Sequence, residues 1–306
     1  MIRTNIEEYE NYGRVLCVSD GTVDAKITLD VGPRVIYLAR KGKKNVFFND
    51  LLRRTCCNKP EMDEYYGKGR CWYLYGGYRL WLSPEGLPHT YYPDNDPVKY
   101  EIDGDTVTFT PPAQTENGLA TGYSLTFKGN GEIGVRNFIK NTSGKVKEGA
   151  VWTLAVMSQR SHTFGAQSVR DTGLLPNRTL VIWPYTDIHD GRIRIENGLA
   201  DVRQDPDGKG ALKIGFNNEL GRIMTLTADG QLFTQTFDTD HINGVYPDGG
   251  CSSEIYSCPD FTEAEALSPL TAIAPGDEAV FELNWTLSEC MVDAAEMKAL
   301  EELIRG

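Results

Sequence analysis

The sequence predicts an all-β protein built from antiparallel strands, with one short helix near its carboxyl end. Glycine and proline recur throughout, at 31 and 15 of 306 residues, and they interrupt the chain too often for long helices. Between these breaks, several segments alternate polar and apolar residues, which is the period of a strand with one buried face. Only one stretch has helical periodicity. Together these observations favour a single antiparallel β domain spanning residues 1–306.

Three hairpins are predicted from short strands that flank a glycine-containing turn tolerant of positive φ. They are 99–102 with 106–110 around Asp103-Gly104, 123–127 with 133–139 around Gly129-Asn130-Gly131, and 224–227 with 231–237 around Asp229-Gly230. Segment 281–287 alternates in the same way and predicts a further strand.

The predicted helix covers about residues 290–305. Between positions 293 and 304 the chain is rich in Ala, Glu, Leu and Met, and Met297, Leu300, Leu303 and Ile304 fall on one helical face. We interpret it as a closing helix that packs on the β domain.

Charge and cysteine usage exclude several classes of protein. A formal net charge of -12 argues against nucleic acid and anionic membranes as partners, because both require a basic surface. Apolar runs such as 150–157 are too short to span a bilayer, and the first residues do not resemble a signal peptide. The 7 cysteines have neither disulfide-framework nor metal-ligand spacing. We therefore expect a cytoplasmic protein with reduced thiols and without metal or cofactor.

Segment 76–97 combines aromatic rings with hydrogen-bonding groups. Arg79 lies between Tyr78 and Trp81, and a loop rich in Pro, Asp and Asn follows. Sugars are bound by such a mixture, because rings cover their C–H edges while guanidinium and carboxylate groups bind their hydroxyls. The alternative is that Tyr78 and Trp81 only pack beneath the loop.

A second candidate segment, 254–287, carries carboxylates. Glu263 and Glu265 are two residues apart, so they share one face of a strand, and Glu254 is expected on the same or a neighbouring sheet. Apolar neighbours would raise the pKa of such a carboxyl toward neutral pH, as a general base requires. The alternative is an outward-facing, solvated pair.

Four segments in order, 29–50, 76–86, 180–188 and 263–277, resemble the galactose mutarotase-like superfamily, and within it an uncharacterised branch known only as a domain of unknown function. The resemblance extends from Tyr12 to Leu287. It implies a β-supersandwich of two large antiparallel sheets with a sugar cleft. In the characterised members a glutamate takes the proton of the anomeric hydroxyl while a histidine protonates the ring oxygen, so that the ring opens and recloses.

Matching the family's elements gives Glu265 as the base, with Glu263 in reserve, and Arg79 as the sugar-holding arginine. Trp152 stands where the family has its acid histidine, and indole cannot act as an acid. Of the four histidines, at 89, 162, 189 and 241, none has a catalytic pattern; His89, His162, His241 or Tyr78 would have to replace the acid. The predicted site is Glu265 as catalytic residue, with Arg79, Tyr78, Trp152, Glu263 and His162 around the sugar.

The predicted function is an aldose 1-epimerase-like isomerase that interconverts the anomers of a free or modified aldose. The expected partner is a small-molecule sugar, and the sequence leaves the oligomeric state open. Two alternatives remain open: a carbohydrate-binding or sensing protein that uses the same cleft without turnover, and an oligosaccharide-processing enzyme on the same fold.

Overall fold

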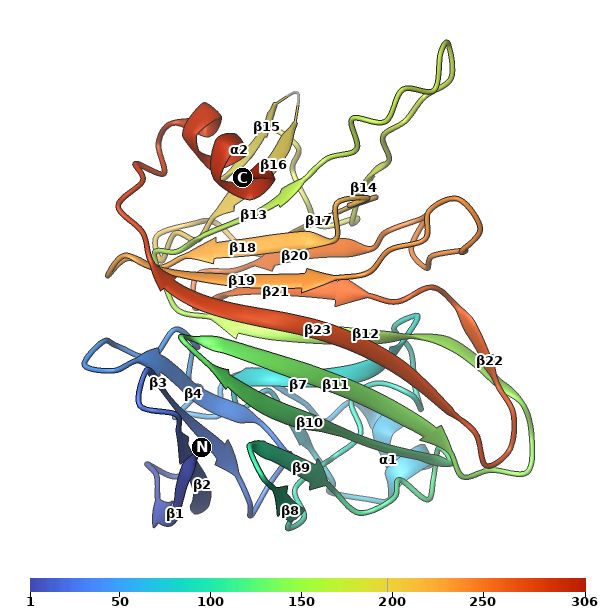
Figure 1. Cartoon of the computed structure of the whole chain (residues 1–306). Helices are drawn as coiled ribbons and strands as arrows, with labels where there is room; N and C mark the ends of the chain where they lie inside the picture. Colours follow the sequence, from blue (N-terminus) through green and yellow to red (C-terminus); the bar gives the residue numbers. More distant parts are fainter. Residues whose placement is uncertain (197) are drawn as a thin grey trace.

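The computed structural model describes residues 1–196 and 198–306 (Figure 1). Within them it consists of two large antiparallel β-sheets, one two-stranded sheet and two short helices. The predicted all-β fold class is thus confirmed, whereas the single domain boundary of 1–306 stays a prediction.

The 11-stranded sheet places strands from the start of the chain at one edge and strands from its second half at the other. In spatial order these are β1 (Arg3–Glu8), β2 (Arg14–Ser19), β3 (Val23–Thr28), β4 (Val35–Arg40), β7 (Gly77–Ser83), β12 (Lys147–Met157), β21 (Thr262–Leu267), β20 (Ser253–Ser257), β17 (Leu212–Phe216) and β14 (Leu180–Ile182), with β22 (Thr271–Ile273) paired to β12.

The 10-stranded sheet has the same division, with strands of the first half of the chain toward one edge and mostly later strands toward the other (Figure 1). In spatial order these are β15 (Ile193–Glu196), β16 (Leu199–Arg203), β13 (His162–Ala166), β18 (Arg222–Leu226), β19 (Gln231–Phe237), β23 (Glu278–Glu289), β11 (Glu132–Asn141), β10 (Leu119–Gly129), β9 (Thr106–Thr110) and β8 (Lys99–Asp103).

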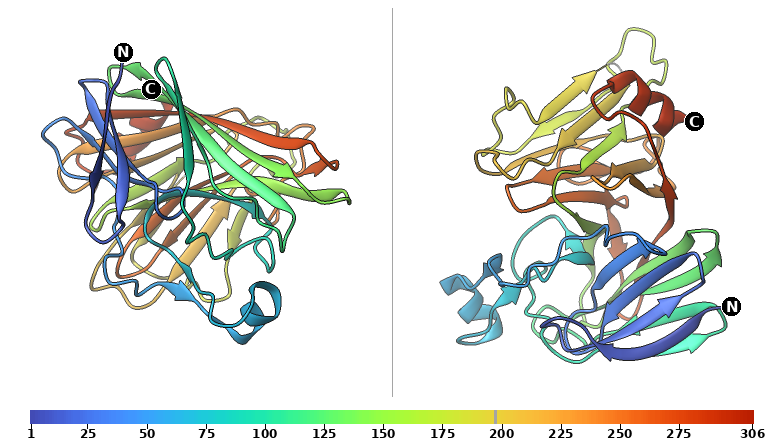
Figure 2. Two further views of the ribbon diagram at one scale, coloured as in Figure 1. Left: turned by 90° about the horizontal axis from the view of Figure 1, so that it is seen from below. Right: turned by 90° about the vertical axis from the view of Figure 1, so that its left-hand side faces the viewer.

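The remaining elements are short. Strands β5 (Cys56–Cys57) and β6 (Trp72–Tyr73) form the two-stranded sheet, and they flank helix α1 (Pro60–Tyr66) in the chain. Figure 2 shows this segment projecting from the side of the body. Helix α2 (Met297–Arg305) ends the chain against the 10-stranded sheet (Figure 1).

The main hydrophobic core lies between the two large sheets. It includes Tyr78 from β7 and Trp285 from β23, whose ring centroids are 4.7 Å apart in a perpendicular arrangement. Leu80 and Leu82 of β7 face the same core. Because side chains alternate along a strand, Arg79 and Trp81 face the opposite side of the 11-stranded sheet. This outer face carries the candidate site.

The three predicted hairpins are confirmed. Asp103 pairs with Thr106 across the first turn, in which Gly104 has φ 57°. In the β10–β11 turn, Gly129, Asn130 and Gly131 all have positive φ, which the glycines adopt without strain. The third hairpin joins β18 and β19.

The two helices differ in how well the sequence indicates them. The C-terminal helix is confirmed, with Met297, Leu300 and Ile304 buried against the 10-stranded sheet, but it begins at Met297 and not near residue 290 as predicted. Helix α1 was not predicted, because its seven residues contain only two buried positions, Met62 and Tyr66, too few to define a helical period. Among the described residues, no helix is long and apolar enough to cross a membrane.

Tyr78 provides a test of the core. Its hydroxyl donates a hydrogen bond to Asn137 Oδ1 at 2.7 Å in the fully buried core. We expect Tyr78→Phe to lower the free energy of unfolding by ~1–3 kcal/mol, because it leaves that buried oxygen unpaired. Urea denaturation measures this change. Tyr65→Phe, at a 45% exposed position, is the matched control and should change stability by less than ~0.5 kcal/mol. Equal effects of the two variants would contradict the assignment.

Candidate functional site

A cavity of about 280 Å³ opens on the outer face of the 11-stranded sheet. Its size is close to the lower end of small-molecule sites, about 300–1,000 Å³. Aromatic rings make up much of its wall, and charged groups stand among them. The aromatic residues are Trp72, Trp81, Tyr91, Trp152, Tyr185, Tyr256 and Phe261, and the charged ones are Lys59, Arg79, Glu85, Lys213 and Glu263.

Strand register aligns the charged side chains in two rows across this face. In one row, Leu154 of β12 lies opposite Arg79 of β7 and opposite Glu265 of β21, and Glu265 lies opposite Glu254 of β20. The next row joins Glu263, Tyr256 and Lys213. Directly paired residues share a face. The sheet therefore gathers charges from four strands.

Arg79 and Glu263 form a buried ion pair at the cavity. Arg79 Nη2 donates to Glu263 Oε1 at 3.1 Å, and the two residues are 4% and 8% exposed. The guanidinium lies 4.1 Å from the centroid of the Trp81 ring and 5.2 Å from that of Trp72. Arg79 Nε and Nη1 have no hydrogen-bond partner among the described residues. Two buried donors thus stay free for an acceptor.

Lys213 joins two further carboxylates. Its Nζ lies 2.6 Å from Glu254 Oε2 and 2.9 Å from Glu265 Oε2, and the Trp152 indole N–H donates to Glu265 Oε2 at 2.7 Å. The ammonium also contacts the faces of Trp152 and Trp183, at 4.6 and 4.7 Å from their centroids. Burial opposes the charge of Lys213, but Glu265 and Glu254 outweigh it and raise its pKa.

These five buried groups are two cations and three carboxylates, so full ionisation would leave one excess negative charge. Burial raises the pKa of Glu263 to about 7, against the lowering effect of Arg79, and nearby Glu265 raises it further. Burial likewise raises the pKa of Glu254. Glu263 can therefore accept or release a proton near neutral pH, which is the requirement for a general base.

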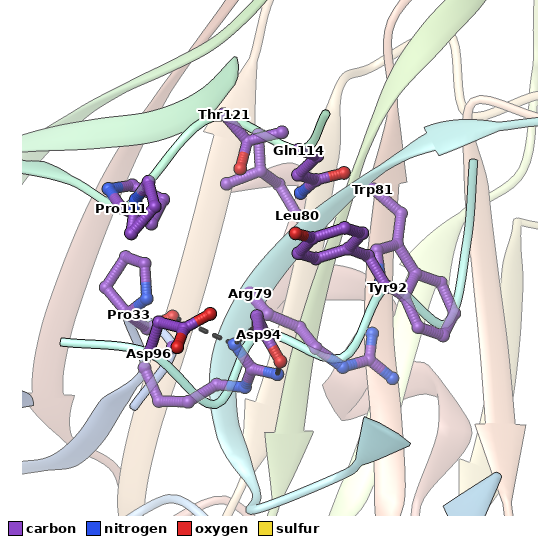
Figure 3. A pocket seen from close by; sticks show the side chains of 13 residues that line it. Pro33, Arg79, Leu80, Trp81, Tyr92, Asp94, Asp96, Pro111, Gln114 and Thr121 are labelled. Atoms are coloured by element: carbon purple, nitrogen blue, oxygen red, sulfur yellow. Dashed lines mark hydrogen bonds and ion pairs between the residues drawn. The ribbon is translucent and has the colours of Figure 1, made fainter. Parts of the chain in front are cut away.

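A second, smaller cavity of about 30 Å³ is also lined by Arg79 and Trp81 (Figure 3). Arg34 and Asp94 line it and form an ion pair at 2.6 Å. This volume suits about one water molecule and excludes a sugar.

The structure places the predicted site residues in four different regions. Arg79, Glu263 and Trp152 line the cavity. Glu265 is fully buried beneath it, bonded to Lys213 and Trp152.

Tyr78 and His162 lie apart from this cavity. Tyr78 belongs to the core between the sheets. His162 lies on β13 of the other sheet, with Nδ1 3.5 Å from Asp201 Oδ1.

The other histidines do not line the cavity either. His241 Nε2 lies 2.8 Å from Ser252 Oγ and its ring stacks on Tyr246, and burial lowers its pKa. Burial also lowers the pKa of half-buried His89, and His189 is exposed. All four histidines are described, and none lines the cavity.

Sequence reasoning missed Lys213 and Tyr91. Lys213 lies in the strand Leu212–Phe216, between Leu212 and Ile214. A lysine between two apolar residues of a strand indicates a charge on the face of the sheet opposite the core, and this signal could have found it. Gly215 in the same strand leaves the necessary room, since a Cβ there would lie 2.5 Å from Cys251 Sγ and 3.3 Å from Glu254 Cγ. Tyr91 stands in an irregular loop, which periodicity does not describe.

A scan against models of known protein families finds no match, and neither does a search of curated proteins. Solved structures are similar. A galactose mutarotase-like protein from Lactobacillus casei aligns with TM-score 0.59 and 11% identity over 90% of this chain and 100% of its own. Galactose 1-epimerase from Lactobacillus acidophilus aligns with TM-score 0.50 and 11% identity, over 95% and 100%.

A TPR-domain containing protein from Parabacteroides distasonis aligns with TM-score 0.60 and 15% identity over 93% of this chain, which spans about half (48%) of that protein. These likenesses show that the chain has a galactose mutarotase-like fold. The narrower assignment to an uncharacterised branch stays a prediction.

The Lys213 cluster predicts pH-dependent stability in a variant. Lys213→Met leaves Glu254 and Glu265 buried without their cation, so we expect a loss of ~3–5 kcal/mol in the free energy of unfolding at about pH 8. The loss should shrink toward about pH 5, because burial raises the pKa of Glu254, which then takes up a proton and no longer needs the cation. Urea denaturation at both pH values measures it. Lys298→Met, at an exposed position on α2, is the control. A loss independent of pH would contradict the ion-pair role.

Proposed function

We propose that the cavity binds a monosaccharide and that the protein interconverts the anomers of an aldose. The observation that carries this proposal is the Arg79–Glu263 pair at the wall of an aromatic cavity, with two unpaired guanidinium donors and a carboxyl whose pKa is raised to about 7. The galactose mutarotase-like fold supports a sugar as the ligand.

In the proposed reaction, Glu263 takes the proton of the anomeric hydroxyl. The bond between the anomeric carbon and the ring oxygen breaks, the ring oxygen gains a proton, and rotation of the aldehyde before reclosure gives the other anomer. The free N–H groups of Arg79 orient the sugar oxygens, and the faces of the surrounding rings cover its C–H edges. The proton for the ring oxygen would come from a tyrosine hydroxyl or from the Lys213 ammonium at the cavity wall.

This proposal gives Glu263 the role that sequence matching assigned to Glu265. Both side chains point to the outer face, but Glu263 borders the cavity whereas Glu265 holds Lys213 and Trp152 from below. Glu265 is then a positioning residue, since it fixes the Trp152 ring against which a sugar would lie.

Two matched variants separate these roles. We expect Glu263→Gln to lower the rate of anomer exchange by ~10²–10⁴-fold while sugar binding persists, because the amide keeps the shape but cannot take the proton. Proton NMR of freshly dissolved α-glucose and α-galactose measures the exchange. Glu282→Gln, exposed on β23, is the control. If Glu265→Gln instead abolishes exchange while Glu263→Gln does not, the proton-transfer role belongs to Glu265.

The pH profile gives a further prediction. Glu263 acts as a base only when ionised, so kcat/KM should rise about tenfold per pH unit below about pH 7 and level off above it. Initial rates of anomer exchange across this range, corrected for the uncatalysed reaction, measure the profile. A flat profile would contradict proton transfer by a carboxyl with this pKa.

A second candidate function is sugar binding without turnover. It is favoured by the position of the four histidines, none of which lines the cavity. Calorimetry with a panel of monosaccharides distinguishes the two: binding together with accelerated exchange supports the isomerase, binding alone supports the second function, and the absence of both would contradict a monosaccharide site.

A further inference from the structure

Three of the cysteines gather at the base of the projecting α1 segment. Cys56 pairs with Tyr73 and Cys57 with Trp72 across the two-stranded sheet, and Cys71 immediately precedes β6. The α1 helix lies between these two strands in the chain. The thiols therefore stand where the segment leaves the body and where it returns.

Strand alternation separates these thiols into two faces. Cys57 and Trp72 are directly paired and share one face, where they pack with Met62 and Phe261 in a buried cluster. The opposite face carries Cys56 and Tyr73. Cys71, one residue before Trp72, falls on that opposite face, diagonally across from Cys56.

Cys56 and Cys71 are diagonal neighbours and differ in exposure. Cys56 is exposed to solvent and Cys71 is half-buried. Burial raises the pKa of the Cys71 thiol, and nearby Cys56 raises it further. Cys71 Sγ also lies 3.3 Å from the carbonyl oxygen of Trp72. Cys56 is thus the accessible thiol and Cys71 its protected neighbour.

The distance between diagonal positions is close to that of a disulfide. Diagonal neighbours of an antiparallel pair have Cα atoms about 7–8 Å apart, whereas disulfides join Cα atoms up to about 6.8 Å apart. A shift of about 1 Å is therefore needed. The two strands have only two residues each and belong to a segment that projects from the side of the body (Figure 2). Cys57 and Trp72 anchor one face in the buried cluster, so the shift has to come from Cys56 and Cys71 on the less buried face.

We propose that Cys56 and Cys71 are a reversible oxidation site that forms a disulfide across the base of the α1 segment. The oxidant is a peroxide. The Cys56 thiolate attacks one peroxide oxygen, the O–O bond breaks, and Cys56 becomes a sulfenic acid while water leaves after protonation. The Cys71 sulfur then attacks the Cys56 sulfur, the S–O bond breaks and a second water leaves. Two thiols are oxidised by two electrons and the peroxide is reduced to water.

This disulfide would act on the cavity wall. Trp72 follows Cys71 directly and lines the cavity, and the Arg79 guanidinium lies 5.2 Å from its ring centroid. Cys56 also lines the cavity, so closing residues 56–71 into a covalent ring restrains this part of the cavity wall. An effect of oxidation on sugar affinity rests on the proposed function; formation of the disulfide does not.

The test is peroxide titration of the full chain followed by mass spectrometry. We expect a loss of two hydrogen masses that dithiothreitol reverses, and a proteolytic peptide pair joined through Cys56 and Cys71. Cys56→Ser should abolish the crosslink. Cys71→Ser should abolish it too and leave a sulfenic acid on Cys56 that dimedone captures. Cys17→Ser and Cys290→Ser, at half-buried free thiols away from this segment, are the controls and should leave the crosslink intact.

Other products would overturn the proposal. A disulfide that includes Cys57, a crosslink between two chains, or oxidation of Cys56 beyond the sulfenic acid without a crosslink would each show that Cys71 is not its partner. These outcomes do not depend on sugar turnover, because the crosslink is mapped without a ligand. Failure of the isomerase assay with the crosslink present therefore contradicts only the proposed function.

Discussion

Burial of unequal charge on the outer face of one sheet is the constraint on which the candidate site depends. Lys213 is held by Glu254 and Glu265, and Arg79 by Glu263, on four strands that come from distant parts of the chain. Each ion pair is costly to desolvate, and its geometry must be good to offset that cost. Because the carboxylates outnumber the cations by one, one carboxyl can bind a proton near neutral pH. Glu263, at the cavity, is that carboxyl, since its pKa is raised to about 7.

The tryptophans serve this arrangement in two ways. Arg79 lies over Trp81, and Lys213 contacts Trp152 and Trp183, so aromatic faces compensate part of the cations' lost hydration. Of these rings, Trp81 and Trp152 also line the cavity. The Trp152 indole N–H binds Glu265, and the face of its ring contacts the Lys213 ammonium. Trp152 thus supports the charged cluster beneath the cavity as well as lining the cavity.

Much of the fold could be predicted because it depends on local signals. Turns with glycine at positive φ and alternating strands fixed three hairpins, and the apolar face of 297–304 fixed α2. The order of strands in the sheets is not a local property. It places β7 from the first third of the chain two strands away from β21 near its end, and only the family resemblance indicated such an arrangement.

The site was predictable to a lesser degree, and the reason is burial. Spacing alone put Glu263 and Glu265 on one face, as the structure has them, but spacing does not tell which carboxylate borders a cavity and which is covered. Tyr78 and Arg79 are adjacent and equally suited to a sugar by composition, yet the alternation of β7 sends one into the core and the other to the outer face.

The same alternation separates Cys57 from Cys56 and Cys71 in a sheet of four residues. In a β-protein of this kind, the face of the sheet to which a side chain points decides its chemistry as much as its residue type. Which of the two faces is the buried one becomes known only when the neighbouring strands are known.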